Sequence, residues 1–563
     1  AVGSGTPASC TDFALRAAVA SGGLVTFNCG PNPHTILVGD DIQIGADTVI
    51  DGGGSQQGGQ ITLSGGDTTR VFITDSRVHF TIRNLTIVHG KEPGPAGMGG
   101  GIYGGYRSTI TISNSRFEEN DGTAGGPRGG GAIAMKSESM LEVRDSAFVH
   151  NRGINGAAIN NLLSGLTVVN STFIENDATL GGSTPDGFGG AIFIDGASAK
   201  GDQIAGTVSI RDSTFVGNRG AGQGGAISSF LYAPDRILIE NTTFNQNQIL
   251  KNVSDEALGG AIKHGGDGQL TIRNATFAEN RALGQGGALW ADGRHSATFT
   301  NVTFTQNRAV GDQSSGNGGL GGAIAGGGNW LCDSCTIANN HAGYIGGGIF
   351  AGSSATLKNT IVSNNTAFNS GNNWYIDQNC STPLIDGGAN LQFPAPTGVN
   401  TGDPTCAASA VIADPKLGVL ADNGGATQTI ALAADSPALD RAKDCPSTDQ
   451  RGISRPQGSA CDIGAYELVK ALGMNPSSVF AGGRGFTLTV RGADFATDSK
   501  IVWDSIELPT RYRDSTRLQA EIPMDKIANS GSVTIAVSKS SFPARNLAIL
   551  VLNSTVNLPL VVS

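Results

Sequence analysis

Charged and aromatic side chains follow the glycine-rich corners of a repeated motif, and they could bind or cleave a polysaccharide. The candidates each stand within a few residues of a corner: Lys136, Phe193, Asp195, Lys263, Trp290, Asp292 and Phe350. Asp195 and Asp292 are equivalent, since each comes three residues after the apolar residue of its corner. If repeats stack at about 4.8 Å, three layers separate the two carboxylates by about 14 Å. Glycosidase pairs need about 5–9.5 Å, so we do not expect this pair to act together.

A base for a polysaccharide lyase is the second chemistry that these corners could supply. Lys263 and His264 lie in sequence between the two aspartates and could remove a proton. The alternation of side chains along a strand places His264 inward, however, which predicts a core or turn residue. The histidines fit no serine triad, and the glycine-rich corners lack the Gly-Lys-Ser/Thr ending of a phosphate loop. We therefore predict no catalytic residue, cofactor or metal site, and retain the corner residues as a binding strip.

The elements that must position this strip come from an internal repeat with a mean period of about 31 residues. Each repeat carries a phenylalanine and, three residues later, an asparagine: Phe117, Phe148, Phe173, Phe215, Phe244, Phe277 and Phe304 with Asn120, Asn151, Asn176, Asn218, Asn247, Asn280 and Asn307. Apolar residues seven and five positions before the phenylalanine give the period of a half-buried strand. A Gly-Gly-Ala-Ile or Gly-Gly-Ala-Leu block alternates with this motif and marks a sharp corner. The pattern predicts a parallel β-helix of about 10–12 coils in which like residues stack as ladders.

Asparagine or aspartate also stands three residues before each phenylalanine, where it can hydrogen-bond turn backbone and stack on its counterparts. The sequons Asn170-Ser-Thr172 and Asn274-Ala-Thr276 arise from this repeat. We expect their asparagines to point inward and to carry no glycan.

The connections between repeats alternate in length. From each anchor to the next corner the spacing is 11 or 12 residues in one repeat and 16 to 20 in the next. The longer connections include 177–188, 248–258 and 308–320. The repeating unit of the sequence is therefore a pair of coils. This pairing predicts a row of protruding loops, about 9.6 Å apart, on one edge of the β-helix. The alternative is that the alternating lengths reflect only how the repeats were duplicated and have no function.

The alternating GGA[I/L/V] and FxxN blocks of residues 80–365 resemble the repeats of polymorphic outer-membrane-protein adhesins, which implies a right-handed parallel β-helix. The segment from Cys10 to Val19 resembles the capping helix of secreted β-helices. Asp449-Gln-Arg-Gly452 with Cys461-Asp-Ile-Gly-Ala-Tyr-Glu467 resembles the choice-of-anchor-Q end of exported bacterial surface proteins. No membrane barrel follows the repeats, which departs from the adhesin family and argues against autotransport.

The sequence after residue 470 changes to short alternating strands separated by turns, as in an immunoglobulin-like sandwich. The order of its motifs resembles IPT/TIG domains, which implies a spacer or assembly module, or alternatively a sugar binder. We therefore expect an all-β chain in five parts: 1–90, the N-terminal cap and first coils; 91–375, the repeats; 376–468, a disulfide-containing end of the β-helix; 469–553, the immunoglobulin-like domain; and 554–563, an apolar tail.

Composition narrows the class of protein. Among 563 residues the formal net charge is −10, which argues against a nucleic-acid partner. No apolar run reaches the length of a membrane span, and the start at Ala1 resembles the end left after a signal peptide is removed.

Eight cysteines predict disulfides in an oxidising compartment and lie near one another in sequence: Cys10 and Cys29, Cys332 and Cys335, Cys380 and Cys406, Cys445 and Cys461. Only Cys332-x-x-Cys335 has zinc spacing, and no second such pair accompanies it.

These observations predict a secreted bacterial cell-surface adhesin or structural protein, with self-assembly into a filament, sheath or surface layer as one form of that role. Its partners would be further copies, bound through the tail, the solenoid ends or the loop row, and a polysaccharide or cell-surface ligand. Two alternatives remain from other classes. One is a polysaccharide lyase or glycoside hydrolase built on the β-helix, and the other is a carbohydrate-binding protein without catalysis.

Overall fold

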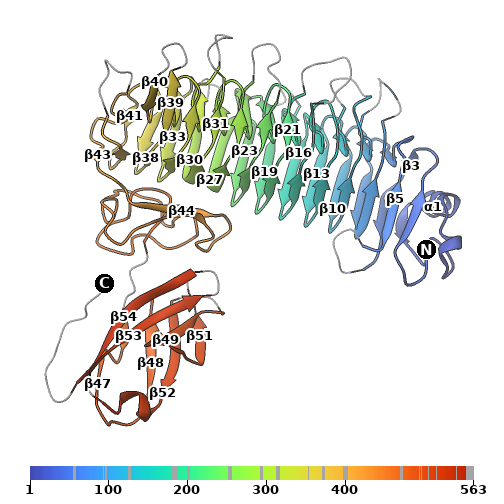
Figure 1. Ribbon diagram of the computed structural model, residues 1–563. Helices are drawn as coiled ribbons and strands as arrows, with labels where there is room; N and C mark the ends of the chain where they lie inside the picture. Colours follow the sequence, from blue (N-terminus) through green and yellow to red (C-terminus); the bar gives the residue numbers. More distant parts are fainter. Residues whose placement is uncertain are drawn as a thin grey trace.

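Short parallel strands stack into a long β-helix in the computed structural model (Figure 1), and a separate two-sheet unit follows it. The structure describes residues 1–54, 59–92, 94, 98–124, 129–179, 187–199, 203–250, 257–291, 296–311, 318–352, 354–369, 374–396, 403–468, 473–492, 495, 497–504, 506–514, 516–529, 531–539 and 542–552.

The wall of the β-helix is made of columns of parallel strands, in which each strand pairs with its counterpart one coil later. We call them columns A to D. Column A contains β1 (Gly23–Thr26), β4 (Thr48–Asp51), β7 (His79–Arg83), β10 (Thr109–Ser113), β13 (Met140–Arg144), β16 (Gly165–Val169), β19 (Thr207–Arg211), β23 (Arg236–Glu240), β27 (Gln269–Ala278), β30 (Ala297–Thr305), β33 (Trp330–Asp333), β37 (Thr356–Lys358) and β41 (Ile385–Asp386).

Column B lies beside column A, and the long strands β27 and β30 run through both. Its other strands are β2 (His34–Leu37), β5 (Ile61–Ser64), β8 (Leu85–Val88), β11 (Arg116–Glu118), β14 (Ala147–Val149), β17 (Thr172–Ile174), β20 (Thr214–Val216), β24 (Thr243–Asn245), β34 (Thr336–Ala338), β38 (Ile361–Ser363), β42 (Leu391–Phe393) and β43 (Val411–Ile412).

Column C begins at the glycine corners. It contains β3 (Ile42–Ile44), β6 (Phe72–Thr74), β9 (Ile102–Gly104), β12 (Ile133–Met135), β15 (Ile159–Leu162), β18 (Ile192–Asp195), β22 (Ile227–Leu231), β26 (Ile262–Gly266), β29 (Leu289–Ala291), β32 (Ile324–Gly326) and β36 (Ile349–Ala351). These 11 strands confirm the predicted fold class and the number of coils.

Column D follows the Phe-x-x-Asn motif in the later coils and ends in an antiparallel hairpin. Its strands are β21 (Arg219–Gly220), β25 (Gln248–Ile249), β28 (Arg281–Ala282), β31 (Arg308–Ala309), β35 (His341–Ala342), β39 (Thr366–Asn369) and β40 (Trp374–Asp377).

The phenylalanines form a continuous stack inside the rod. From Phe117 to Phe304 successive ring centroids are 4.6–5.0 Å apart and the rings are nearly parallel, within 14°. Every ring of this stack is fully buried. The spacing follows from the distance between paired strands, so one ring per coil fills the interior without gaps.

The asparagines form a second ladder beside the rings. Asn176 donates from its backbone nitrogen and from Nδ2 to Oδ1 of Asn218, at 3.0 and 2.9 Å. Asn218 makes the same pair of bonds to Asn247, and its Nδ2 also donates to the carbonyl oxygen of Phe173. An inner member of the ladder such as Asn218 therefore accepts two side-chain hydrogen bonds and donates two, although it is fully buried. The pattern runs from Asn120 beyond the predicted members to Asn379.

Backbone corners make this stacking possible. The residue before each ladder asparagine has a positive φ, for example Glu175 at 49° and Glu279 at 55°. At the other corner Gly259 has a φ of 69°, and a Cβ on Gly260 would collide with the carbonyl oxygen of Gly287 in the next coil. Glycine is required there because the adjacent coil approaches too closely for a side chain.

The expectation that the sequon asparagines point inward was wrong, whereas the expectation that they carry no glycan stays a prediction. Asn170 is exposed, with a φ of 46°, and its Nδ2 donates to Oδ1 of Asp145 in the previous coil. Asn274 is half-buried and bonds to Asn241 in the same way. These residues form an outer ladder at a left-handed turn, because that turn directs their side chains away from the core.

The N-terminal end of the rod is closed by the short helix α1 (Asp12–Val19), which a 3₁₀ turn (Pro7–Ser9) precedes. The side chain of Thr11 caps this helix by accepting a hydrogen bond from the backbone of Ala14. Leu15 and Val19 are buried in the rod's core. A disulfide between Cys10 and Cys29 ties the helix to the first coil.

After the last coil, residues 413–468 form a unit that we call the cap. It contains the hairpin β44 (Leu417–Ala421) and β45 (Thr429–Leu432) and lies against the last coils (Figure 1). A shared core joins Ile361 and Leu391 of the rod to Leu432, Ile463 and Tyr466 of the cap. The remaining disulfides are Cys332–Cys335, Cys380–Cys406 and Cys445–Cys461, and the structure has no free cysteine.

The last described unit is a β-sandwich with its own apolar core. One sheet contains β46 (Gly473–Asn475), β48 (Phe486–Arg491), β51 (Thr510–Asp514) and β52 (Arg517–Ile522). The other contains β47 (Ser478–Phe480), β49 (Lys500–Trp503), β50 (Ile506–Glu507), β53 (Gly531–Lys539) and β54 (Phe542–Leu552), and a 3₁₀ turn spans Met524–Ile527. The predicted tail, 554–563, lies outside the described residues, as do the tips of the long connections at 180–186, 251–256 and 312–317.

The inner ladder predicts a large and local cost for losing one amide. Asn218→Ala would leave two donors of Asn176 and the carbonyl oxygen of Phe173 unpaired in the core. At about 1–3 kcal/mol for each buried group, we expect the unfolding free energy to fall on the order of 3–5 kcal/mol, measured by denaturant-induced unfolding. Asn245→Ala, on the outer face of the same sheet, is the matched control and should cost under about 1 kcal/mol. Equal losses in the two variants would contradict the ladder's role.

Candidate functional site

The corner residues are arranged by the register of column C. Ile192, Ile227, Ile262 and Leu289 pair in succession and point into the core. The next residue of each strand must then face outward. This outward row contains, in successive coils, Phe193, Ser228, Lys263 and Trp290.

Lys263 occupies the centre of an aromatic group. Its Nζ lies 5.6 Å from the ring centroid of Phe230 and 5.7 Å from that of Trp290. The residue is only 8% exposed, so the aromatic faces replace much of the water around its ammonium. Cation–π contacts of this kind contribute about 0.5–2 kcal/mol each and fix the direction of the side chain.

Aromatic and polar groups extend this arrangement on both sides. Phe230 is 39% exposed and packs edge-on against Tyr232, with ring centroids 5.3 Å apart. The hydroxyl of Tyr232 donates to Oδ1 of Asp195 at 2.8 Å. Burial and the adjacent carboxylate raise the pKa of Tyr232 to about 12, so it stays a hydroxyl donor at neutral pH. The indole nitrogen of Trp290 donates to Gln285.

We call Phe193, Asp195, Phe230, Tyr232, Lys263 and Trp290 the aromatic strip. It spans the four coils from β18 to β29, which is about 14 Å along the rod. Phe193 and Trp290 are half-buried, so each presents part of a ring to solvent. The strip can therefore offer flat apolar faces together with a carboxylate, a phenol and a shielded cation.

The remaining predicted strip residues are not part of this group. Phe350 is in the same outward row but two coils beyond Trp290, with Ala325 between them. Lys136 is exposed and follows β12, three coils before β22, which carries Phe230. Asp292 lies outside the described residues. Sequence analysis missed Phe230 and Tyr232, although both follow the corner motif at Ile227 and a count of aromatic residues near each corner would have found them.

A serine and a histidine meet beneath the strip. The Oγ of Ser229 and Nδ1 of His264 are 2.9 Å apart, and Nε2 of His264 contacts the carbonyl oxygen of Gly268 at 3.2 Å. Ser229 and His264 are 1% and 4% exposed, as expected for side chains that point inward. This pair serves the core, because a substrate cannot reach a nucleophile buried to this extent.

A second polar surface runs along column D as an open groove of about 750 Å³. It crosses four coils and is lined by Glu279, Gln306, Arg308, Asn339, His341, Asn364 and Thr366. Burial and the nearby Arg308 lower the pKa of His341, so this imidazole is neutral at pH 7. Groove and strip lie on different columns of the rod.

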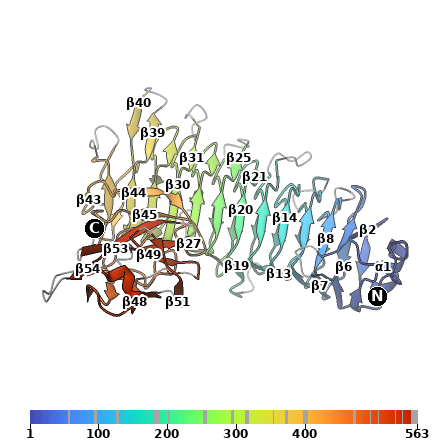
Figure 2. The ribbon, with the colours of Figure 1, turned by 60° about the horizontal axis from the view of Figure 1, so that its bottom comes forward.

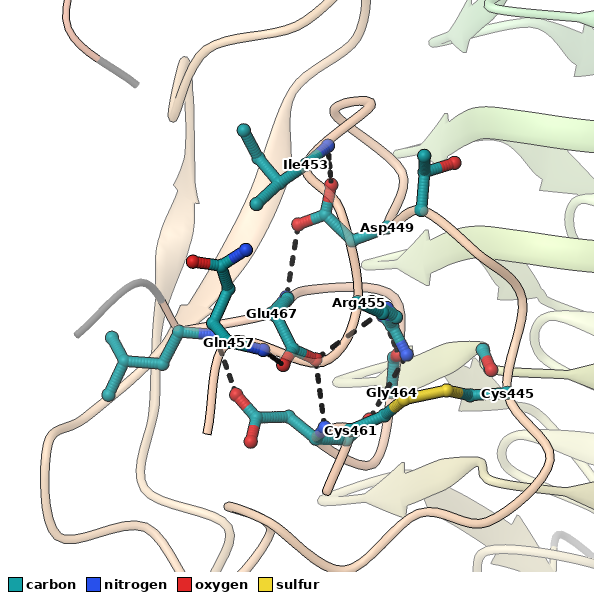
Figure 3. Close-up of polar contacts among 12 residues, drawn as sticks. Cys445, Asp449, Ile453, Arg455, Gln457, Cys461, Gly464 and Glu467 are labelled. Atoms are coloured by element: carbon teal, nitrogen blue, oxygen red, sulfur yellow. Dashed lines mark hydrogen bonds and ion pairs between the residues drawn. A yellow bond between two sulfur atoms is a disulfide. The ribbon is translucent and has the colours of Figure 1, made fainter. Parts of the chain in front are cut away.

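A buried cluster of charged residues lies inside the cap (Figure 3) and was not expected from sequence analysis. Asp449 accepts hydrogen bonds from the backbone nitrogens of Arg451, Ile453 and Glu467. The carboxylate of Glu467 accepts from the backbone of Gln457 at 2.7 Å, and it lies 3.7 Å from Nε of Arg455. By accepting these hydrogen bonds, the two carboxylates fix the backbone of the cap's loops.

Asp462 is a carboxyl group of this cluster with a strongly raised pKa. It accepts hydrogen bonds from the backbone nitrogens of Asp440 and Leu468, at 2.8 and 2.6 Å. Its burial, together with the nearby charge of Glu467, raises its pKa from 3.8 to about 6. Burial also raises the pKa of Glu467. The cap therefore contains two carboxyl groups that prefer their protonated form more than they would in water.

Comparison with known proteins identifies the class of fold. A family model described as a right-handed β-helix region matches residues 49–253. The rod is therefore a right-handed parallel β-helix, in agreement with the stacked columns. Searches of curated proteins and of solved structures found no match to the chain.

Among the described residues, no group of three or more histidine, cysteine, aspartate and glutamate side chains could hold a metal ion. No helix in the described part of the chain is long and apolar enough to cross a bilayer.

The raised pKa of Asp462 predicts a specific dependence on pH. The folded state binds this proton more tightly than the unfolded state, so the contribution of Asp462 to stability is greatest below about pH 4 and is lost as the pH rises through about 6. In the Asp462→Asn variant, the loss of unfolding free energy over this pH range should be smaller by up to about 2–3 kcal/mol. The raised pKa of Glu467 should account for the loss that remains. Thermal unfolding between pH 3.5 and 7.5 measures the difference. Asp422→Asn, an exposed change in the same cap, is the control; identical profiles for wild type and Asp462→Asn would contradict the prediction.

Proposed function

We propose that this protein is a secreted cell-surface rod of the adhesin type that binds a polysaccharide through the aromatic strip. The observation that carries the proposal is the partly exposed line of Phe193, Phe230 and Trp290 around a shielded Lys263. A pyranose ring has faces of C–H groups that pack on aromatic rings, and its hydroxyls need polar partners at the edge. Asp195, Tyr232 and Lys263 are polar partners of this kind.

The form of the rod supports this assignment. The strip lies along the stacking direction, so a linear glycan would meet one coil after another, with ring faces on the aromatics. The inner ladders keep successive coils in register, and this rigidity lowers the entropic cost of binding. The acidic net charge of −10 favours neutral or cationic ligands over strongly anionic ones, except near Lys263 or Arg308.

Secretion rests on the disulfides. All eight cysteines are paired in four bridges, which persist in oxidising compartments and are rare in reducing ones. The choice-of-anchor-Q and IPT/TIG resemblances point in the same direction, toward an exported bacterial surface protein. Anchoring and self-assembly remain part of this proposal.

Catalysis is the weaker alternative. Of the two bases considered for a lyase, His264 is buried and bonded at both ring nitrogens, and Lys263 is 8% exposed beside Phe230 and Trp290. Asp195 accepts a hydrogen bond from Tyr232. We therefore expect binding without cleavage. Incubation with each polysaccharide, followed by assays for new reducing ends and for unsaturated products, distinguishes the two; either product would establish an enzyme.

The binding proposal is tested on the strip itself. Trp290→Ala and Phe230→Ala should each weaken binding to the recognised polysaccharide at least about fivefold, since truncating an aromatic anchor of a binding surface costs about 1 kcal/mol or more. Affinity electrophoresis over a panel of soluble neutral and acidic polysaccharides, followed by calorimetry, gives the measurement. Phe13→Ala, which alters an exposed ring on α1, is the control and should bind as wild type does. Wild-type affinity in the Trp290→Ala variant would reject the strip.

A further inference from the structure

The cap binds one part of an outer face of the rod. Thr276, Thr303 and Thr336 form an outward row on consecutive coils of column B and are 0–2% exposed beneath the cap. The hydroxyl of Thr303 donates to Oε1 of Gln450 at 2.7 Å. The hydroxyl of Thr336 accepts from the backbone nitrogen of Ala465 at 3.1 Å. This face of the rod thus already binds polypeptide.

Side chains of the rod recognise mainly the backbone of the cap. The hydroxyl of Thr276 donates to the carbonyl oxygen of Gln428. Nδ2 of Asn301 donates to the carbonyl oxygen of Thr448 at 2.9 Å, and Nδ2 of Asn359 to that of Lys443 at 2.8 Å. Because these bonds use carbonyl oxygens, they place little demand on the sequence that is bound.

The bound stretch of the cap follows the rod axis. Asn301 and Asn359 are two coils apart, about 9.6 Å, and they hold residues five apart in the cap. Pro446 lies between the two bonded carbonyl groups. A proline is tolerated there because it keeps its carbonyl oxygen and loses only an N–H that the rod does not use.

The same rows continue past the edge of the cap. On the next three coils toward the N-terminus, column B presents half-buried, uncharged side chains that we call the bare face: Thr172, Ile174, Thr214, Val216, Thr243 and Asn245. In Figure 2 the cap lies over the end of the rod that carries β27 and β30, while β14 and β20 stand clear of it. The bare face is thus continuous with an occupied polypeptide-binding surface.

We propose that residues 553–563, which follow β54, bind along the bare face, either within one molecule or between two copies. This segment contains no charged residue, as the bare face contains none, and its leucines and valines match Ile174 and Val216. Its Pro559 is compatible with recognition through carbonyl oxygens. Eleven extended residues reach about 36 Å, more than the three coils of the bare face require. The proposal is independent of polysaccharide binding.

A photo-cross-linker at Val216 of the full chain tests this directly. With benzoylphenylalanine at Val216, irradiation and mass spectrometry should locate the cross-link within 553–563. The yield should be at least fivefold above that from Ile73, an outward residue of column C. Mixing ¹⁵N-labelled and unlabelled chains separates the two arrangements, since a cross-link between labelled and unlabelled peptides shows binding between copies.

Variants and a peptide complete the test. Thr214→Arg should reduce the Val216 cross-link at least fivefold, whereas Thr62→Arg, in the same outward row but five coils away, should leave it unchanged. The synthetic peptide of residues 553–563 should compete, which gives a readout even if Thr214→Arg unfolds the protein. A cross-link from Val216 only to other segments, or none above the Ile73 background, would overturn the proposal.

Discussion

Each buried amide of the rod must find its partners in the neighbouring coils, and the asparagine ladder satisfies this requirement completely. An amide such as Asn218 accepts two hydrogen bonds from the coil before it and donates to the coil after it and to a phenylalanine carbonyl. A buried polar group without partners would cost about 1–3 kcal/mol, so one displaced coil would destabilise both neighbours. The ladder therefore fixes the register in which the phenylalanine rings stack and the glycine corners meet.

Once the register is fixed, the outer positions are free to differ from coil to coil. Column C shows this freedom, because one outward row presents Phe193, Ser228, Lys263 and Trp290 in turn. The aromatic strip arises where large side chains follow one another and enclose the lysine. Function on such a rod is therefore a matter of which coils carry which outer residues, and the fold itself does not determine it.

The cap covers an outer face of the last coils with loops of its own, and it buries the outward row of Thr276, Thr303 and Thr336. Those loops have little regular structure, so their backbone nitrogens are held by the buried carboxylates of Asp449, Asp462 and Glu467. The bare face lies next to the cap and presents the same kind of uncharged side chains as the surface that the cap covers.

The sequence by itself determined the parallel β-helix, its approximate number of coils and the stacked Phe-x-x-Asn motif, because a period repeated many times averages out local ambiguity. The right hand of the β-helix came from the resemblance of the repeats to a known family and from the matching family model. The sequence also indicated Phe193, Lys263 and Trp290, which share a register, and Asp195, which stands two positions after Phe193. Only the tertiary structure decided that Phe230 and Tyr232 complete the group, that Asn170 faces solvent, and that Gln450 reaches Thr276 and Thr303. The physical reason is that some of these contacts depend on the direction of a side chain at a left-handed turn, and others join residues up to 174 positions apart. Neither kind of contact produces a periodic pattern in the sequence.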